Sequence, residues 1–256
     1  MQQSLLILGR QPALGIAELE SLFGADTVHP VGTHAVLLDV EPSNVPFSRL
    51  GGSIKLAKLL TGLPGVAFSK HADYIAQTLP QHLQYIPEGK IKFGISTFGL
   101  KLAVNDINRA TLRIKKTIKA AGRSVRVVPN NELALNSAQV QHNQLTSPVG
   151  MELILVANDN STLLAQTVAE QDIEAYAARD QKRPKRDAKV GMLPPKLAQI
   201  IINLTGLQPS EPIPTVLDPF CGTGVVLQEA QLMGYEAYGT DLEPRMVDFA
   251  RANIEW

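Results

Sequence analysis

The last forty residues alternate between short apolar runs and helical patterns, and this order constrains the fold more than any other feature of the chain. The first apolar run leads into Asp218, and the second ends just before Asp241. An order of strand, glycine turn, helix, strand and acid is typical of the start of a Rossmann-like α/β domain. The pattern predicts a strand at 214–217, a glycine turn at 220–224, a helix at 225–233, a strand at 236–239 and a helix at 244–254.

The glycine turn predicts a nucleoside site. Gly222 and Gly224 carry no side chain and permit a positive φ, so a ligand can approach the backbone. Asp241 follows Asp218 by 241 − 218 = 23 residues, where an acid accepts hydrogen bonds from ribose hydroxyls. The sequence G-T-G fits G-x-G-x-x-G poorly, and the absence of G-K-[ST] excludes a P-loop. We therefore expect a nucleoside without phosphate, most commonly S-adenosylmethionine. The alternative is an ordinary βαβ unit whose glycines only form a turn.

Length and composition predict a globular protein of two or three domains, since 256 residues with 45% hydrophobic content can bury more than one core. The single cysteine, Cys221, excludes an intramolecular disulfide and favours a cytoplasmic location. We interpret Cys221 as a small residue in a tight turn, not as a nucleophile. The histidines show no metal-ligand spacing, so we expect no metal site. The sequence shows no signal peptide and no apolar run of eighteen residues, so we expect no membrane span.

The net charge of zero hides an uneven distribution. Residues 88–126 hold ten Lys or Arg against two acids, residues 179–189 hold six against two, and residues 217–256 hold two against seven. Basic clusters attract phosphate backbones, whereas the alternative is a solvated helix face. The candidate RNA-binding residues are Arg109, Arg113, Lys116, Lys119, Arg123, Arg183 and Arg186.

Periodicity predicts mixed strands and helices before the C-terminal pattern. We expect strands at 4–8, 33–40, 91–97, 124–128, 151–156 and 162–168, and helices at 13–23, 49–60, 71–84, 105–121 and within 191–204, where Pro194 and Pro195 favour a helix start.

Four sequence motifs resemble one enzyme family. D-P-F-C-G-T-G at 218–224 resembles motif I of class I methyltransferases that act on exocyclic amines of nucleic-acid bases. G-T-D-L-E-P-R-M at 239–246 is similar to the ribose-binding segment of that group. With R-D-Q-K-R-P-K-R-D at 179–187 and G-M-L-P-P-K-L-A at 191–198, the chain resembles the archaeal and eukaryal THUMP-domain tRNA guanosine N2-methyltransferases.

This resemblance implies a multidomain fold of the α/β and α+β classes. It places a ferredoxin-like domain at 1–65, a THUMP-type RNA-binding domain at 66–176, a basic linker at 177–190 and the start of a Rossmann-like methyltransferase domain at 191–256. The arginines of the linker either contact phosphate or fasten domains by pairing with Asp180 and Asp187. The expected S-adenosylmethionine-binding residues are Asp218, Pro219, Phe220, Gly222, Thr223, Gly224, Asp241 and Leu242.

The resemblance implies methylation of the N2 amine of a guanosine in tRNA, with a small protein partner as a further expectation. Such enzymes carry an Asp/Asn-Pro-Pro-aromatic loop, which this sequence lacks, so no catalytic residue is assigned. We therefore expect a chain truncated within its methyltransferase domain and inactive alone. The alternatives are a non-catalytic RNA-binding protein with a vestigial methyltransferase half, and a DNA or RNA amino-methyltransferase acting on adenine or cytosine.

Overall fold

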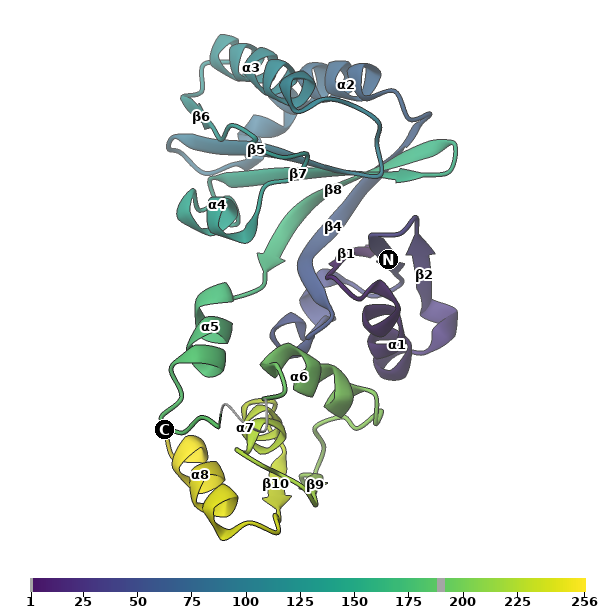
Figure 1. Cartoon of the computed structure of the whole chain (residues 1–256). Helices are drawn as coiled ribbons and strands as arrows, with labels where there is room; N and C mark the ends of the chain where they lie inside the picture. Colours follow the sequence, from purple (N-terminus) through teal and green to yellow (C-terminus); the bar gives the residue numbers. More distant parts are fainter. Residues whose placement is uncertain (1, 188–191) are drawn as a thin grey trace. The chain divides into compact units, whose positions relative to one another are not determined.

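The computed structural model describes residues 2–187 and 192–256, and their contacts divide the chain into two compact units (Figure 1). Unit 1 comprises Met1–Ile7, His29–Val45 and Ile54–Gln171. Unit 2 comprises Leu8–Val28, Pro46–Ser53 and Asp172–Trp256. Each unit therefore joins segments that are distant in the sequence.

Unit 1 is built on a mixed sheet, whose described strands follow the order β2-β3-β1-β4-β8-β7-β5-β6. Strand β5, next to the edge strand β6, runs parallel to both β6 and β7, whereas β8 is antiparallel to β7 and β4. The strands are β1 (Ser4–Leu8), β2 (Val28–Val31), β3 (Ala35–Leu38), β4 (Ser53–Pro64), β5 (Ile91–Phe98), β6 (Val125–Val127), β7 (Gly150–Asn158) and β8 (Ser161–Glu170).

Helices cover both faces of the β5–β7 region (Figure 1). The long helices α2 (Phe68–His82) and α3 (Val104–Ala120) bury their apolar stripes on one face, where Ile75, Ile114 and Phe93 share a core. The short helix α4 (Ser137–His142) covers the other face, where Gly94 leaves room for Leu135. Since apolar residues recur at helical spacing along α3, its opposite face is left to polar and basic side chains.

Unit 2 combines the first helix of the chain with its C-terminal third. The two short strands β9 and β10 are parallel, with Asp218 opposite Gly239. Ile202, Ala230 and Met233 form an apolar core between α6 and α7. The elements are α1 (Pro12–Phe23), α5 (Ile173–Gln181), α6 (Pro195–Asn203), β9 (Thr215–Asp218), α7 (Val225–Leu232), β10 (Glu236–Gly239) and α8 (Pro244–Ile254). Short 3-10 turns lie at Ala25–Thr27, Pro42–Asn44, Phe47–Arg49 and Leu83–Tyr85.

A buried carboxylate ties α1 to α6. Glu18 is fully buried and accepts hydrogen bonds of 2.9 Å from the backbone N–H groups of Gly51 and Gly52. Asn203, at the end of α6, donates its Nδ2 to Glu18 Oε1 at 2.8 Å and to Arg49 O at 2.7 Å. Burial raises the pKa of Glu18, and these donors lower it in part. A charge this deep is tolerated because each oxygen has a donor.

The strand and helix predictions for the C-terminal pattern are confirmed to within a residue or so. The helix expected at 49–60 is wrong, because Ser53–Pro64 is strand β4 and pairs along its length with β8. The apolar residues of Arg49–Leu60 fit the spacing of a helix as well as that of a strand. Pairing with β8 makes the segment from Ser53 onward a strand. The mixed α/β class is confirmed, whereas the ferredoxin-like and THUMP assignments and their boundaries stay predictions.

Two observations concern the segments on either side of the expected domain limits. The strands of residues 1–65 belong to the same sheet as those of 66–176. Residues 177–181, at the start of the expected linker 177–190, form the end of α5. Residues 188–191, which include the end of that linker and the start of the G-M-L-P-P motif, lie outside the described residues.

Candidate cofactor site

The turn after β9 is held by backbone hydrogen bonds to the residues that follow β10. Thr240 N–H donates to Asp218 O at 3.0 Å, and Cys221 N–H donates to Thr240 O at 2.9 Å. Thr240 Oγ1 also donates to Pro219 O at 2.9 Å. These bonds extend the pairing of β9 and β10 beyond the strands. The two loops therefore lie side by side at the carboxyl edge of the sheet, where α/β folds bind ligands.

Both acids predicted from the sequence take part in this turn. Asp218 Oδ1 accepts from Phe220 N–H at 3.0 Å. Asp241 Oδ2 accepts from Gly222 N–H at 2.9 Å, and its Oδ1 accepts from Glu243 N–H at 2.9 Å. A carboxylate oxygen has two lone pairs, so Asp241 keeps acceptor capacity for two further donors such as ribose hydroxyls. The structure thus brings Asp218, Gly222 and Asp241 together.

The two glycines of the turn have different surroundings. Gly224 begins α7 with φ +84°, and a Cβ there would lie 2.9 Å from the Cβ of Ala250 in α8. Gly222 has φ +51°, and, its two chain neighbours apart, no heavy atom of the described residues lies within 4 Å of a Cβ built on it. Gly224 therefore permits close packing of α7 on α8, whereas Gly222 faces open space that a ligand can enter.

The remaining predicted cofactor residues surround this turn. Phe220 is 79% exposed and Leu242 is 93% exposed, so each presents apolar surface to solvent beside the turn. Thr223 is buried, and its carbonyl accepts a hydrogen bond from Asn253 at 2.8 Å. Exposed apolar side chains next to unfilled acceptors suit a ligand with both an aromatic ring and hydroxyl groups. The donors, acceptors and space around Gly222 therefore fit a nucleoside.

Cys221 is buried behind the turn. Burial raises the pKa of its thiol, and the nearby carboxylates of Asp218 and Asp241 raise it further. A thiolate is the reactive form of cysteine, and this environment disfavours it. The side chain packs with Leu227 and Ala250 in a small apolar cluster.

The basic segment 179–187 packs against α7 and α8 within unit 2. Arg179 Nε donates to the fully buried Glu229 at 2.7 Å, and Arg245 pairs with Asp187 at 2.7 Å. Arg183 is buried, with Nε donating to Arg179 O at 2.7 Å, whereas Arg186 is exposed. These pairs lie within unit 2, so both roles that the sequence leaves open for these arginines stay predictions.

Asn253 is a residue that sequence reasoning missed. It is fully buried on α8, and its side chain exchanges two hydrogen bonds with the backbone of Lys185, at 2.9 and 3.0 Å. The same Nδ2 donates to Thr223 O in the glycine turn. The signal was available, because Asn253 follows Met246 and Ala250 on the apolar stripe of α8. Asn253 therefore connects the basic segment to the glycine turn.

The predicted RNA-binding residues of unit 1 divide into two groups. Lys116 and Lys119 are exposed on α3. Arg109 pairs with Asp106 at 2.6 Å, and Arg113 pairs with Asp73 at 2.5 Å, both in exposed positions. Arg123 instead donates to the carbonyls of Leu83, Ile86 and Pro87, so it stabilises the turn after α2. An RNA-binding role for all of them stays a prediction.

Two features are absent from residues 2–187 and 192–256. Within this part of the chain, no three or more His, Cys, Asp or Glu side chains gather closely enough to hold a metal ion. None of its helices is both long and apolar enough to cross a membrane.

The C-terminal segment is similar to known proteins. Residues 181–255 match the model of the RMKL-like methyltransferase domain family. The tRNA (guanine(10)-N2)-dimethyltransferase of Methanothermobacter thermautotrophicus is 45% identical over 78 residues, which cover 30% of this chain and 22% of that protein. The enzyme of the same name from Methanocaldococcus jannaschii is 28% identical over 158 residues, which cover 61% and 40%. The chain thus spans less than half the length of these relatives.

Two solved structures share the fold over nearly the whole chain. TrmN from Thermus thermophilus has a TM-score of 0.53 and 16% identity, covering 98% of this chain and 68% of its own. A possible methylase from Clostridium difficile 630 has a TM-score of 0.54 and 14% identity, covering 99% and 72%. Residues 181–255 are thus similar to a methyltransferase domain, and the fold of the chain is similar to that of these two structures.

Proposed function

We propose that the protein belongs to an S-adenosylmethionine-dependent methyltransferase system that modifies the N2 amine of a guanosine in tRNA. The observation that carries this proposal is the glycine turn, where Gly222 faces open space and Asp241 keeps free acceptor capacity. The printed activity of the matched relatives, tRNA (guanine(10)-N2)-dimethyltransferase, supports the choice of tRNA and of the N2 amine.

The residues of unit 2 have distinct tasks in this proposal. Asp241 accepts the ribose hydroxyls, and Gly222 admits the nucleoside to the backbone. Phe220 and Leu242 cover the adenine ring with apolar surface that is otherwise exposed. When bound, S-adenosylmethionine supplies an electrophilic methyl group. The protein contributes chiefly orientation and effective concentration.

The acceptor side of the reaction needs a further group. The lone pair of the guanine N2 amine is delocalised into the ring, so hydrogen-bond acceptors must stabilise the charge that develops on nitrogen. No Asp/Asn-Pro-Pro-aromatic sequence occurs within these 256 residues. We therefore propose that this chain by itself binds the cofactor without transferring its methyl group.

Unit 1 supplies RNA binding in this proposal. Residues 66–176 would form a THUMP-type module, with the exposed Lys116 and Lys119 on α3 contacting phosphates. A small protein partner and a cytoplasmic location belong to the same proposal, as expectations from the family resemblance.

The proposal is tested by titrating the full chain with S-adenosylmethionine in a calorimeter. We expect saturable binding that Asp241→Asn weakens at least tenfold, because an amide presents one acceptor oxygen instead of two. Asp248→Asn is the matched control, since Asp248 is an exposed acid on α8 whose contact is a 3.9 Å pair with Arg251. It should leave the affinity within twofold.

Circular dichroism melts of each variant separate lost binding from lost folding. Equal affinity in the wild-type chain and Asp241→Asn would reduce Asp241 to a residue that holds the turn. No binding by a folded wild-type chain would reject the proposal and favour a non-catalytic RNA-binding protein.

A further inference from the structure

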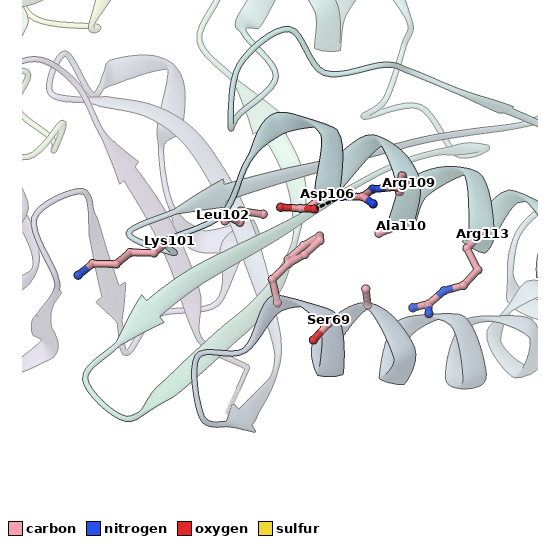
Figure 2. Close-up of a pocket in the computed structure, with 9 residues that line it drawn as sticks. Ser69, Lys101, Leu102, Asp106, Arg109, Ala110 and Arg113 are labelled. Carbon is pink, nitrogen blue, oxygen red and sulfur yellow. Dashed lines mark hydrogen bonds and ion pairs between the residues drawn. The ribbon is translucent and has the colours of Figure 1, made fainter.

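Unit 1 contains a pocket of about 600 Å³ between the amino-terminal halves of α2 and α3 (Figure 2). This volume lies within the range of roughly 300–1,000 Å³ that is typical of small-molecule sites. One wall of the pocket is apolar and consists of Phe68 of α2, Leu102 of the loop before α3, and Ala110 of α3. The pocket is thus large enough for a ligand with a ring system, and its apolar wall would bury part of the surface of that ring.

The charged residues that line the pocket favour an anionic ligand. Among the described lining residues, Lys101, Arg109 and Arg113 are cationic, and Asp106 carries the one carboxylate. Figure 2 shows Asp106 and Arg109 joined by their ion pair, with Arg113 extending from α3 toward α2. Both arginines are paired with acids in exposed positions, where an ion pair contributes only about 0–1 kcal/mol. A phosphate can therefore redirect either guanidinium at small cost.

Asp106 gives the pocket a second preference. Its Oδ2 accepts Ala103 N–H at 3.0 Å and its Oδ1 accepts Arg109 at 2.6 Å. The Ala103 N–H and then Arg109 lower the pKa of this carboxyl, so it stays ionised and acts only as an acceptor. A ligand must offer N–H or O–H groups to Asp106 while it offers negative charge to the arginines.

We propose that this pocket binds one unpaired nucleotide, with its base against the apolar wall, an N–H edge of the base at Asp106 and its phosphate at Arg109 and Arg113. Inorganic phosphate would leave the apolar wall and Asp106 unused. An acidic peptide would bring its carboxylates to the arginines but no ring to the apolar wall. A nucleotide in RNA as the source of the ligand rests on the proposed function.

The experiment measures binding of a fluorescent single-stranded RNA hexamer to the full chain by anisotropy, with GMP, UMP and inorganic phosphate as competitors. We expect Arg113→Gln to weaken RNA binding at least fivefold. Arg126→Gln is the matched control, because Arg126 is exposed on β6 outside the pocket, and it should change binding less than twofold. GMP should compete at lower concentration than UMP, since guanine offers both N1–H and N2–H to Asp106.

The preference for GMP over UMP tests Asp106 directly, because it would not change if Asp106 only stabilised the fold. Asp106→Asn should bring GMP and UMP to within twofold of each other, because the amide offers a donor as well as an acceptor. If the RNA hexamer binds and GMP competes with it, the pocket accepts both a nucleotide within a strand and a free nucleotide. RNA binding that GMP leaves intact supports a nucleotide held within a strand, and GMP binding without RNA binding supports a free nucleotide.

Two results would overturn the proposal: wild-type affinities in both Arg113→Gln and Asp106→Asn, or no binding of any probe by the folded chain. S-adenosylmethionine titrations of the same variants keep the two proposals apart. Loss of pocket binding with unchanged cofactor affinity rejects the pocket alone. Failure of cofactor binding rejects the proposed function and leaves the pocket result readable.

Discussion

The basic face of α3 and the basic segment 179–187 have a similar excess of positive charge in the sequence, yet their charges have different surroundings. On α3, Lys116 and Lys119 are exposed. In the segment, Arg179 meets a fully buried glutamate and Arg183 is itself buried. The difference arises from the partners, since Glu229 of α7 offers a buried carboxylate to Arg179, and Asn253 of α8 holds the backbone of Lys185. Charge density alone therefore does not distinguish an RNA-binding surface from a structural ion-pair network.

The largest effect should come from removing the buried partner of Arg179. Glu229→Ala should lower the free energy of unfolding of unit 2 by about 3–5 kcal/mol, because it leaves a partly buried guanidinium without its carboxylate. Hydrogen exchange of α7 and α8 peptides during urea unfolding reports this loss. The double variant Arg179→Leu/Glu229→Leu should lose less than the single one, since both charges are gone. If Glu229→Ala lowers the free energy of unfolding by less than about 1 kcal/mol, the Arg179–Glu229 pair contributes no more than a surface ion pair.

Unit 1 also contains a buried titratable group, Glu170, which makes the stability of this unit depend on pH. Glu170 of β8 lies 3.8 Å from Lys55 Nζ, near Glu152 and Ser137. Burial raises its pKa to about 7, against the opposing effect of Lys55. The folded state therefore prefers the protonated acid. The resulting stabilisation is full below about pH 4.5 and is lost as the pH rises through about 7.

We expect unit 1 to lose up to about 3 kcal/mol of stability between about pH 5 and pH 8.5 through Glu170. Urea unfolding followed by hydrogen exchange of β8 measures this slope. Glu170→Gln, which keeps the shape and removes the titration, should flatten it. An unchanged slope in that variant would assign the pH dependence to other groups.

The third effect concerns the link between the basic segment and the turn. Asn253→Ala removes the hydrogen bonds to Lys185 and Thr223 and should cost about 2 kcal/mol. Because Thr223 lies in the glycine turn, the affinity for S-adenosylmethionine should fall as well. Calorimetry and thermal melts of the same sample measure the two effects. Asn158→Ala is the control, because Asn158 lies at the end of β7 in unit 1 and should leave the cofactor affinity unchanged.

The smallest effect on stability is expected at the exposed cations. Lys116→Gln and Lys119→Gln should change stability by less than about 0.5 kcal/mol each. Each should reduce the slope of log affinity for tRNA against log salt by roughly 1 if it contacts a phosphate. Arg123→Gln gives the contrast, because its three hydrogen bonds to carbonyls predict a loss of stability. Unchanged salt slopes in both lysine variants would make the face of α3 a solvated surface.

Local patterns predicted the strands and helices around the glycine turn well because these elements follow one another directly in the sequence. Asp218, Gly222, Gly224 and Asp241 lie within one strand-turn-helix-strand unit, and their spacing follows from that unit. The strand Ser53–Pro64 was missed because its partner, β8, lies about a hundred residues later. The burial of Arg183 was missed for a similar reason, since Glu229, whose carboxylate interacts with its guanidinium, lies 46 residues later in the chain.

The hydrogen bonds of Glu18 have a consequence for the order of events during synthesis. Asn203, its side-chain partner in α6, is made 185 residues later. At roughly 5–20 residues per second, a ribosome takes about 10–40 s to cover that distance. The backbone donors of Gly51 and Gly52 are made early in this interval, but Asn203, which completes the hydrogen bonds of the buried carboxylate, does not yet exist. The first helix of the chain therefore completes its docking among the last, after all of unit 1 has been synthesised.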